Sequence, residues 1–227
     1  MANFQSVKAI TLKKEAGLSR ATTDTASRNP SPYVYQGKTG WHTNKGVTYT
    51  TFVEASKRYG FENNANNFLT MPEAIWDKIA KGMYWDFLRL DTLKSDGVAI
   101  QLFSLVWGGL SWYNAMQRYL SSKGISWNKN PSTLASAVNT LIDKQGERKT
   151  IEELDVVQQD YYKSLNQPAN TRGWVNRVKE TTQYAYNYIG NVVKEVAQNK
   201  NVVNYALLGV GIILVASASY YIYKKNV

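Results

Sequence analysis

Apolar side chains recur every three or four positions along most of the chain, a spacing that predicts a mainly α-helical fold. The first such pattern, in residues 4–14, predicts a helix that ends near Lys14. The pattern stops in residues 16–49, where glycine and proline recur, and it resumes from Thr50 onward. Because a long loop inside a compact domain usually carries function, residues 16–49 are the first place to look for a site.

Short signatures predict where several of the later helices begin. Segments 70–73 (Thr-Met-Pro-Glu) and 150–153 (Thr-Ile-Glu-Glu) both have the sequence of a capping box. In a capping box, a threonine and a glutamate three residues later satisfy the free N–H groups of a first turn. Ser95 and Pro131 are placed to begin two further helices, and a last helix is expected to begin near Thr171 or Arg172.

The C-terminal end of the chain has the pattern of a single membrane span. Residues 201–223 contain no charged side chain, and a bilayer requires about 20 such residues in a helix. Tyrosines lie at both ends of the segment, and Lys224 and Lys225 follow it. We therefore predict a single C-terminal transmembrane helix. Lysines occur in equal number on both sides of it, so charge does not set its orientation.

Composition excludes several kinds of chemistry. The chain has no cysteine and one histidine, His42, which rules out disulfides, thiolate zinc sites and a multi-histidine metal site. We expect neither a metal nor a cofactor. The net charge of +10 comes from scattered residues, which favours attraction to an anionic cell envelope over nucleic-acid binding. The first residues lack the apolar stretch and cleavage site of a secretory signal peptide.

Five short segments carry a more specific signal. They are Glu-Ala-Gly-Leu-Ser at 15–19, Asp-Thr-Ala-Ser-Arg-Asn-Pro at 24–30, Thr-Asn-Lys-Gly-Val-Thr at 43–48, Ile-Trp with Tyr-Trp-Asp at 75–86, and Gly-Trp-Val-Asn-Arg at 173–177. In this order they resemble glycoside hydrolase family 108, the phage and bacterial N-acetylmuramidases. The resemblance covers about residues 5–180, and the segment at 24–30 is similar to a loop of the versions seen in Bacteroidetes and their phages.

The resemblance implies a domain organisation. A lysozyme-like helical muramidase domain with the long polar loop would occupy residues 1–125. A helical half that resembles a peptidoglycan-binding domain would occupy residues 126–182. A juxtamembrane helix (183–200) and the transmembrane helix (201–223) would follow.

The resemblance also implies roles for particular residues. Glu15 takes the place of the family's catalytic acid, and its position between a helix and a polar loop suits an acid that burial keeps protonated. Asp24, on the same loop, is either a second catalytic carboxylate or a residue that hydrogen-bonds within a turn. The remaining candidates are assigned to substrate binding or to the support of Glu15: His42, Thr43, Asn44, Thr48 and Trp85.

The sequence therefore predicts a membrane-anchored peptidoglycan hydrolase of phage origin, used for host entry or lysis. Its partners would be peptidoglycan, the lipid membrane and other virion proteins, and it would lie in a virion membrane or the host inner membrane. The alternative is a catalytically silent virion protein that uses a muramidase scaffold to anchor itself in a membrane. A holin-like pore former fits less well, because one span carries a large polar domain.

Overall fold

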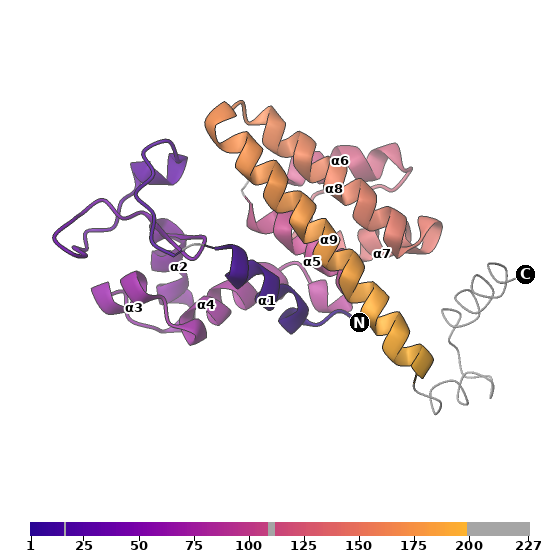
Figure 1. Cartoon of the computed structure of the whole chain (residues 1–227), viewed down its shortest axis with the longest axis horizontal. Helices are drawn as coiled ribbons and strands as arrows, with labels where there is room; N and C mark the ends of the chain where they lie inside the picture. Colours follow the sequence, from indigo (N-terminus) through magenta and orange to yellow (C-terminus); the bar gives the residue numbers. More distant parts are fainter. Residues whose placement is uncertain (16, 109–111, 199–227) are drawn as a thin grey trace, which may run out of the picture. The chain divides into compact units, whose positions relative to one another are not determined.

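A computed structural model of the chain describes residues 1–15, 17–108 and 112–198, and it confirms the mainly helical fold (Figure 1). Residues Met1–Ala185 form one compact unit, and a second unit begins at Tyr186. The predicted boundary after residue 125 falls inside the first unit. The predicted transmembrane segment 201–223 lies outside the described residues. Within the ranges that are described, no helix is both long enough and apolar enough to cross a bilayer.

The elements follow one another along the chain with short connections, apart from the loop that begins after Glu15. The α-helices are α1 (Phe4–Lys14), α2 (Tyr49–Tyr59), α3 (Ala65–Thr70), α4 (Glu73–Ala80), α5 (Asp96–Trp107), α6 (Trp112–Ser122), α7 (Leu134–Gln145), α8 (Glu147–Ser164) and α9 (Pro168–Gln198). Short 3₁₀ or π turns are η1 (Thr25–Arg28), η2 (Lys81–Trp85), η3 (Leu90–Thr92) and η4 (Pro131–Thr133). A small antiparallel hairpin joins β1 (Thr43–Asn44) to β2 (Val47–Thr48).

Helix α5 is the centre of the first unit. Nine of its 12 residues are buried, because α1 packs on one side of it and α8 on another. Figure 1 shows α2, α3 and α4 grouped on one side of α1, and α6, α7 and α8 on the other. Aromatic rings fill the space between α1, α4 and α5, with Phe4, Trp76 and Phe103 at its middle. This core holds the first turn of α1, the helix that leads to Glu15.

Two of the predicted helix starts are confirmed. The side chain of Ser95 accepts a hydrogen bond of 3.2 Å from the Val98 N–H and so caps α5. Pro131 begins the turn η4, which runs directly into α7. Proline suits this position because the first residues of a helix have no intrahelical partner for their N–H groups.

Both predicted capping boxes are wrong. Thr70 ends α3 instead of capping α4, and its hydroxyl donates back to the Asn66 carbonyl at 2.7 Å. Thr150 lies one turn inside α8, with its hydroxyl bonded to the Gly146 carbonyl at 2.8 Å. Helix α8 begins earlier because Gly146, at φ +83°, lets the chain reverse directly after α7.

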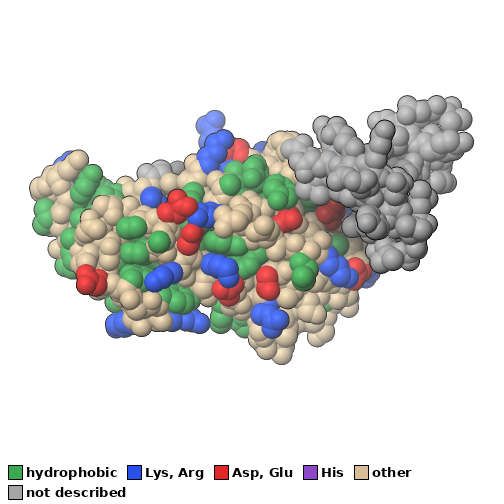
Figure 2. All heavy atoms as spheres, turned by 90° about the horizontal axis from the view of Figure 1, so that it is seen from below, with side chains coloured by type: hydrophobic (Ala, Val, Ile, Leu, Met, Phe, Trp, Pro, Cys, Tyr) green, Lys and Arg blue, Asp and Glu red, His purple; other side chains and the backbone are tan. Residues whose placement is uncertain are grey.

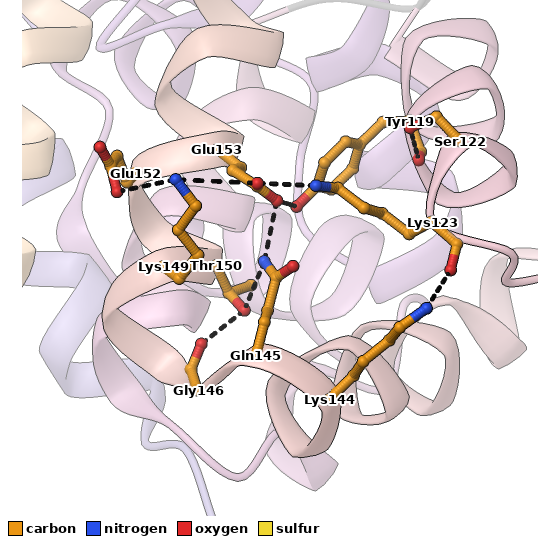
Figure 3. Close-up of polar contacts among 10 residues, drawn as sticks. All are labelled: Tyr119, Ser122, Lys123, Lys144, Gln145, Gly146, Lys149, Thr150, Glu152 and Glu153. Carbon is orange, nitrogen blue, oxygen red and sulfur yellow. Dashed lines mark hydrogen bonds and ion pairs between the residues drawn. The ribbon is translucent and has the colours of Figure 1, made fainter.

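Glu153, the glutamate of the second capping-box signature, does not cap α8 but connects three helices. Glu153 binds Lys123 (2.6 Å), Tyr119 (2.9 Å) and Gln145 (2.8 Å), and so links α8 to α6 and α7 (Figure 3). Burial alone would raise the pKa of Glu153, but the hydrogen bonds from these three side chains outweigh it and lower the pKa. Burial and the bond to Glu153 raise the pKa of Tyr119, so this phenol stays a donor. The hydrogen bonds among Glu153, Tyr119, Lys123 and Gln145 therefore have a structural role: they hold α6, α7 and α8 together.

The surface carries its charge in the scattered form that the sequence predicts. On the face seen in Figure 2, Lys and Arg side chains are interspersed with Asp and Glu and with small apolar areas. A face with mixed signs attracts polyanions only in a general way, so local arrangements of charge decide what binds.

Candidate active site

Glu15 lies at the junction of α1 and the long loop, as the sequence predicts. Helix α1 ends at Lys14 with basic residues in its last turn, and Glu15 leaves the helical conformation at φ −90° and ψ 112°. Its N–H still bonds to the Thr11 carbonyl at 3.1 Å, which holds the residue against the helix end. Its side chain is 13% exposed. The carboxyl group is therefore mostly buried but still reachable from one side.

The turn of the β1–β2 hairpin packs directly onto this carboxyl group. A Cβ atom added to Gly46 would lie 2.7 Å from Glu15 Oε2 and 2.6 Å from Trp107 Nε1. Gly46 also has a φ of +76°, which side-chain-bearing residues rarely adopt. Only glycine satisfies both conditions. The hairpin thus brings its bare backbone against the acid and against the last residue of α5.

Arg177 is the charged neighbour of the acid. Its Nη1 lies 3.4 Å from Glu15 Oε1, and its side chain is 45% exposed. Lys14 holds this part of α9 in place: its Nζ donates to the Arg177 carbonyl and to the Glu180 carboxylate, both at 2.9 Å. Two consecutive residues at the end of α1 are therefore linked to one segment of α9.

Burial and charge act on Glu15 in opposite directions. Burial raises the pKa of Glu15, since a carboxylate loses solvation in an apolar surrounding. The Arg177 guanidinium and the Trp107 indole N–H lower it, but burial has the larger effect, so the pKa stays above its ordinary value. Trp107 Nε1 is buried and has no hydrogen-bond partner among the described residues. The indole N–H thus acts on the carboxyl group through its proximity and not through a well-formed hydrogen bond.

A small cavity adjoins the acid. Its volume is about 30 Å³, enough for a water molecule, and it lies between α1, α5, α8 and α9. Polar groups that line it include Glu15, Ser104, Tyr162 and Arg177. Burial raises the pKa of Tyr162, which keeps its hydroxyl protonated. A water molecule here would have several hydrogen-bonding partners close to the acid.

Asp24 is engaged in the loop's own structure. Its carboxylate accepts a hydrogen bond of 2.9 Å from the Ala26 N–H and so caps the turn η1. This is the turn hydrogen bond that the sequence offered as one of two alternatives. A catalytic role for Asp24 stays a prediction.

The polar residues around the hairpin hold it in shape. Asn44 is buried and donates to the Phe68 and Leu69 carbonyls at 2.8 and 3.0 Å, which fixes the end of α3. Thr48 caps α2 by accepting from the Thr51 N–H at 3.1 Å. These contacts hold the hairpin against α3 and begin α2. Substrate binding by Asn44 and Thr48, or support of Glu15, stays a prediction.

Thr43 and His42, the other two candidates near the hairpin, differ in how they are bonded. Thr43 pairs with Thr48 across the hairpin and bonds to Ser19, so it ties the hairpin to the start of the long loop. His42 is buried, and neither ring nitrogen has a hydrogen-bond partner within the described parts of the chain. Its main chain, in contrast, is bonded to Ser19 and Tyr49. Direct contact of either side chain with a substrate stays a prediction.

Trp85 does not belong to a surface that could bind a sugar. It is 2% exposed, and its ring packs against Phe4 and Phe103. Of the Tyr-Trp-Asp segment that suggested a binding role, Trp85 belongs to the hydrophobic core, whereas Asp86 is exposed and pairs with Lys81. We correct the prediction accordingly: Trp85 supports α1 from within.

Sequence reasoning missed three residues that touch the acid. Gly46 and Arg177 both lie inside segments that carried the family resemblance, but nothing in the sequence shows that they meet Glu15. Trp107 lies at the end of a buried helix, where a tryptophan is most simply read as a core residue. Gly46 and Arg177 could have been proposed as site residues because they lie in the matched segments 43–48 and 173–177.

A mostly buried carboxyl group with a raised pKa, open on one side, is the arrangement of a general acid, the group with which glycoside hydrolases protonate a leaving sugar. The comparisons with known proteins agree with this class. Residues 8–109 match the family model described as Glycosyl hydrolase 108, which supports a glycoside hydrolase domain there. The match includes Glu15, Gly46 and Trp107 and ends before Tyr162 and Arg177.

Similarity to solved structures extends further along the chain. The structure described as "Structure of Brucella abortus SagA" aligns with a TM-score of 0.58 and 16% sequence identity, covering 81% of this chain and 93% of that one. At this identity the likeness shows the fold alone. No curated protein matches the chain.

Proposed function

We propose that this protein is a peptidoglycan hydrolase that cuts the glycan strand between N-acetylmuramic acid and N-acetylglucosamine. The observation that carries the proposal is the state of Glu15, a buried carboxyl group with a raised pKa inside the segment that matches the glycoside hydrolase family. A protonated acid at this place can donate to a glycosidic oxygen that enters from the open side.

The reaction begins with that proton transfer. Glu15 protonates the glycosidic oxygen, the bond from the anomeric carbon breaks, and positive charge develops on the remaining sugar ring. Arg177 stabilises the Glu15 carboxylate once the proton has left, since the two groups are 3.4 Å apart. Water then adds to the anomeric carbon and gives one proton to a carboxylate beside it, which leaves the sugar neutral. For the carboxylate that positions this water we propose Asp24, which must then give up its turn bond to Ala26.

Product analysis tests which bond is cut. Purified peptidoglycan is digested, the new reducing ends are converted to alcohols with borohydride, and the sugars are identified by mass spectrometry. The proposal expects reduced muramic acid. Reduced glucosamine would instead indicate an N-acetylglucosaminidase, and no new reducing end would support the catalytically silent scaffold.

We also propose that residues 201–223 anchor the enzyme in a membrane as a single pass. Support comes from the sequence: an uncharged stretch of 23 residues with tyrosines near both ends, followed by two lysines. The similarity of segment 24–30 to phage enzymes favours a viral origin. A permanent anchor favours a virion membrane, where other virion proteins would be neighbours, over the host inner membrane, because a free lytic enzyme has no need of one. Mass spectrometry of purified particles and of infected-cell membranes would separate these two locations.

A further inference from the structure

A groove of about 520 Å³ lies between the long loop and α2, away from the contacts of Glu15. One wall is the loop segment Arg28–Pro30, and the other is the face of α2 that runs from Tyr49 to Lys57. Pro30 and Val53 supply apolar surface. The rim carries Arg28, Lys57 and Glu54, three charged side chains that are exposed.

The three rim charges have no partner of opposite charge among the described residues. Among the described residues, no ion pair or hydrogen bond engages the side chain of Arg28, Glu54 or Lys57. The groove therefore offers two cationic side chains for carboxylates and one carboxylate for an amine.

The groove begins close to the acid. Gly46 lies against the Glu15 carboxyl group, and Tyr49, which lines the groove, is three residues further along the chain. Consecutive Cα atoms are 3.8 Å apart, so the Cα atoms of Gly46 and Tyr49 are within about 11 Å of each other. One end of the groove therefore lies within reach of a branch that leaves the glycan strand near Glu15.

Building on the function proposed above, we propose that this groove binds the peptide stem of peptidoglycan. The stem is the branch that hangs from the muramic acid residue. It carries carboxylates on its glutamate and at its C-terminus, and an amine where its third residue is a diamino acid. Arg28 and Lys57 would bind the carboxylates, and Glu54 would bind the amine.

The dimensions agree with this assignment. From Tyr49 to Lys57, α2 rises about 12 Å, at 1.5 Å for each of eight residues. An extended peptide of four residues spans at most about 14 Å. The groove thus has room for a stem of that length laid along the helix, whereas a single free ion would leave most of it empty.

Two substrates separate stem binding from glycan cleavage. One is intact peptidoglycan, and the other is the same glycan after an amidase has removed the stems. The Arg28→Ala/Lys57→Ala double variant should lose activity on the intact wall by about fivefold to tenfold, mainly through KM, the size expected for two partly exposed charge contacts. On the stripped glycan it should match the wild type. The difference should shrink as salt is raised.

The matched control is Lys78→Ala/Arg118→Ala. It also removes one lysine and one arginine. Both are exposed and make no ion pair with the described residues, so the control reproduces the loss of net charge at a different place. The control should behave as wild type on both substrates. An equal loss of the groove variant on both substrates, or no loss on either, would overturn the assignment of the groove to the stem.

Binding of a soluble stem tetrapeptide, followed by nuclear magnetic resonance, tests the groove without relying on turnover. The wild type should show saturable shifts in α2 that the groove variant loses and the control keeps. Absence of binding by the wild type at millimolar peptide would contradict stem recognition. Failure of the proposed hydrolase looks different, because peptide binding would persist while neither glycan substrate is cut.

Discussion

At the scale of single residues, the site consists of the Glu15 carboxyl group and the three residues that contact it, which are Gly46, Trp107 and Arg177. Glu15 could be located from the sequence, because it opens the first of the matched segments and ends a predicted helix. Arg177 could not be paired with it, since 162 positions separate them and no local pattern encodes the contact. Trp107 and Gly46 became visible only when the hairpin and α5 were seen to meet at the acid.

The ion pair leads to a prediction about pH. Arg177→Met keeps the length of the side chain but removes the charge that lowers the pKa of Glu15, so that pKa should rise further. A general acid is active while protonated, and activity is lost as pH rises through its pKa. The alkaline limit of the kcat profile should therefore move to higher pH in this variant, while Arg177→Lys should lie between.

The measurement is the rate of wall lysis across a pH series, with melting temperature followed in parallel. A shift of the alkaline limit to lower pH would mean that Arg177 does not act on Glu15 through charge. A uniform loss of rate at every pH, with no shift, would point to a different task for Arg177, such as holding the substrate.

At the scale of elements, helix existence was easier to predict than helix boundaries. The spacing of apolar residues found α1, and Ser95 correctly marked the start of α5. The two capping-box signatures predicted the wrong helix starts, because the start of a helix also depends on residues outside the four-residue pattern. Gly146 allows α8 to begin a turn before Thr150, and Asn44 fixes the end of α3 from a distant part of the chain.

The hairpin gives the second prediction. Gly46→Ala should reduce lysis by at least about tenfold, because its Cβ would displace the Glu15 carboxyl group or the Trp107 indole. It should also cost about 1 kcal/mol or more in the free energy of unfolding, since alanine resists positive φ.

Gly124→Ala is the matched control for backbone strain. Gly124 has a similar φ of +73°, and a Cβ there would meet no atom within 4 Å. It should lose similar stability but keep its rate of lysis. If both variants were equally active, close packing of Gly46 on the acid would not matter for function.

At the scale of the whole molecule, the catalytic unit is larger than the segment that matches the family model. That match ends at residue 109, but Arg177 reaches Glu15 from α9, and Val178 and Ala185 of the same helix are buried in the first unit. Sequence similarity found the part that carries the acid. It could not show that a later helix completes the surroundings of that acid, because this depends on tertiary packing.

Two truncations test this view. A chain that ends at residue 199 keeps all described contacts of Glu15 and lacks the predicted anchor, so it should be soluble and cut purified walls at the full rate. A chain that ends at residue 167 lacks α9 and exposes the surface that Val178 and Ala185 cover. It should melt at a clearly lower temperature and lyse poorly. An unimpaired shorter chain would show that α9 is dispensable.

The central claim is that Glu15 supplies the catalytic proton, and Glu15→Gln tests it most directly. Glutamine keeps the shape but cannot donate that proton, so the rate of glycan cleavage should fall by about 10² or more. The melting temperature at neutral pH should not fall, since burial disfavours the carboxylate in the folded state. A folded Glu15→Gln protein that cuts peptidoglycan as fast as the wild type would contradict the account.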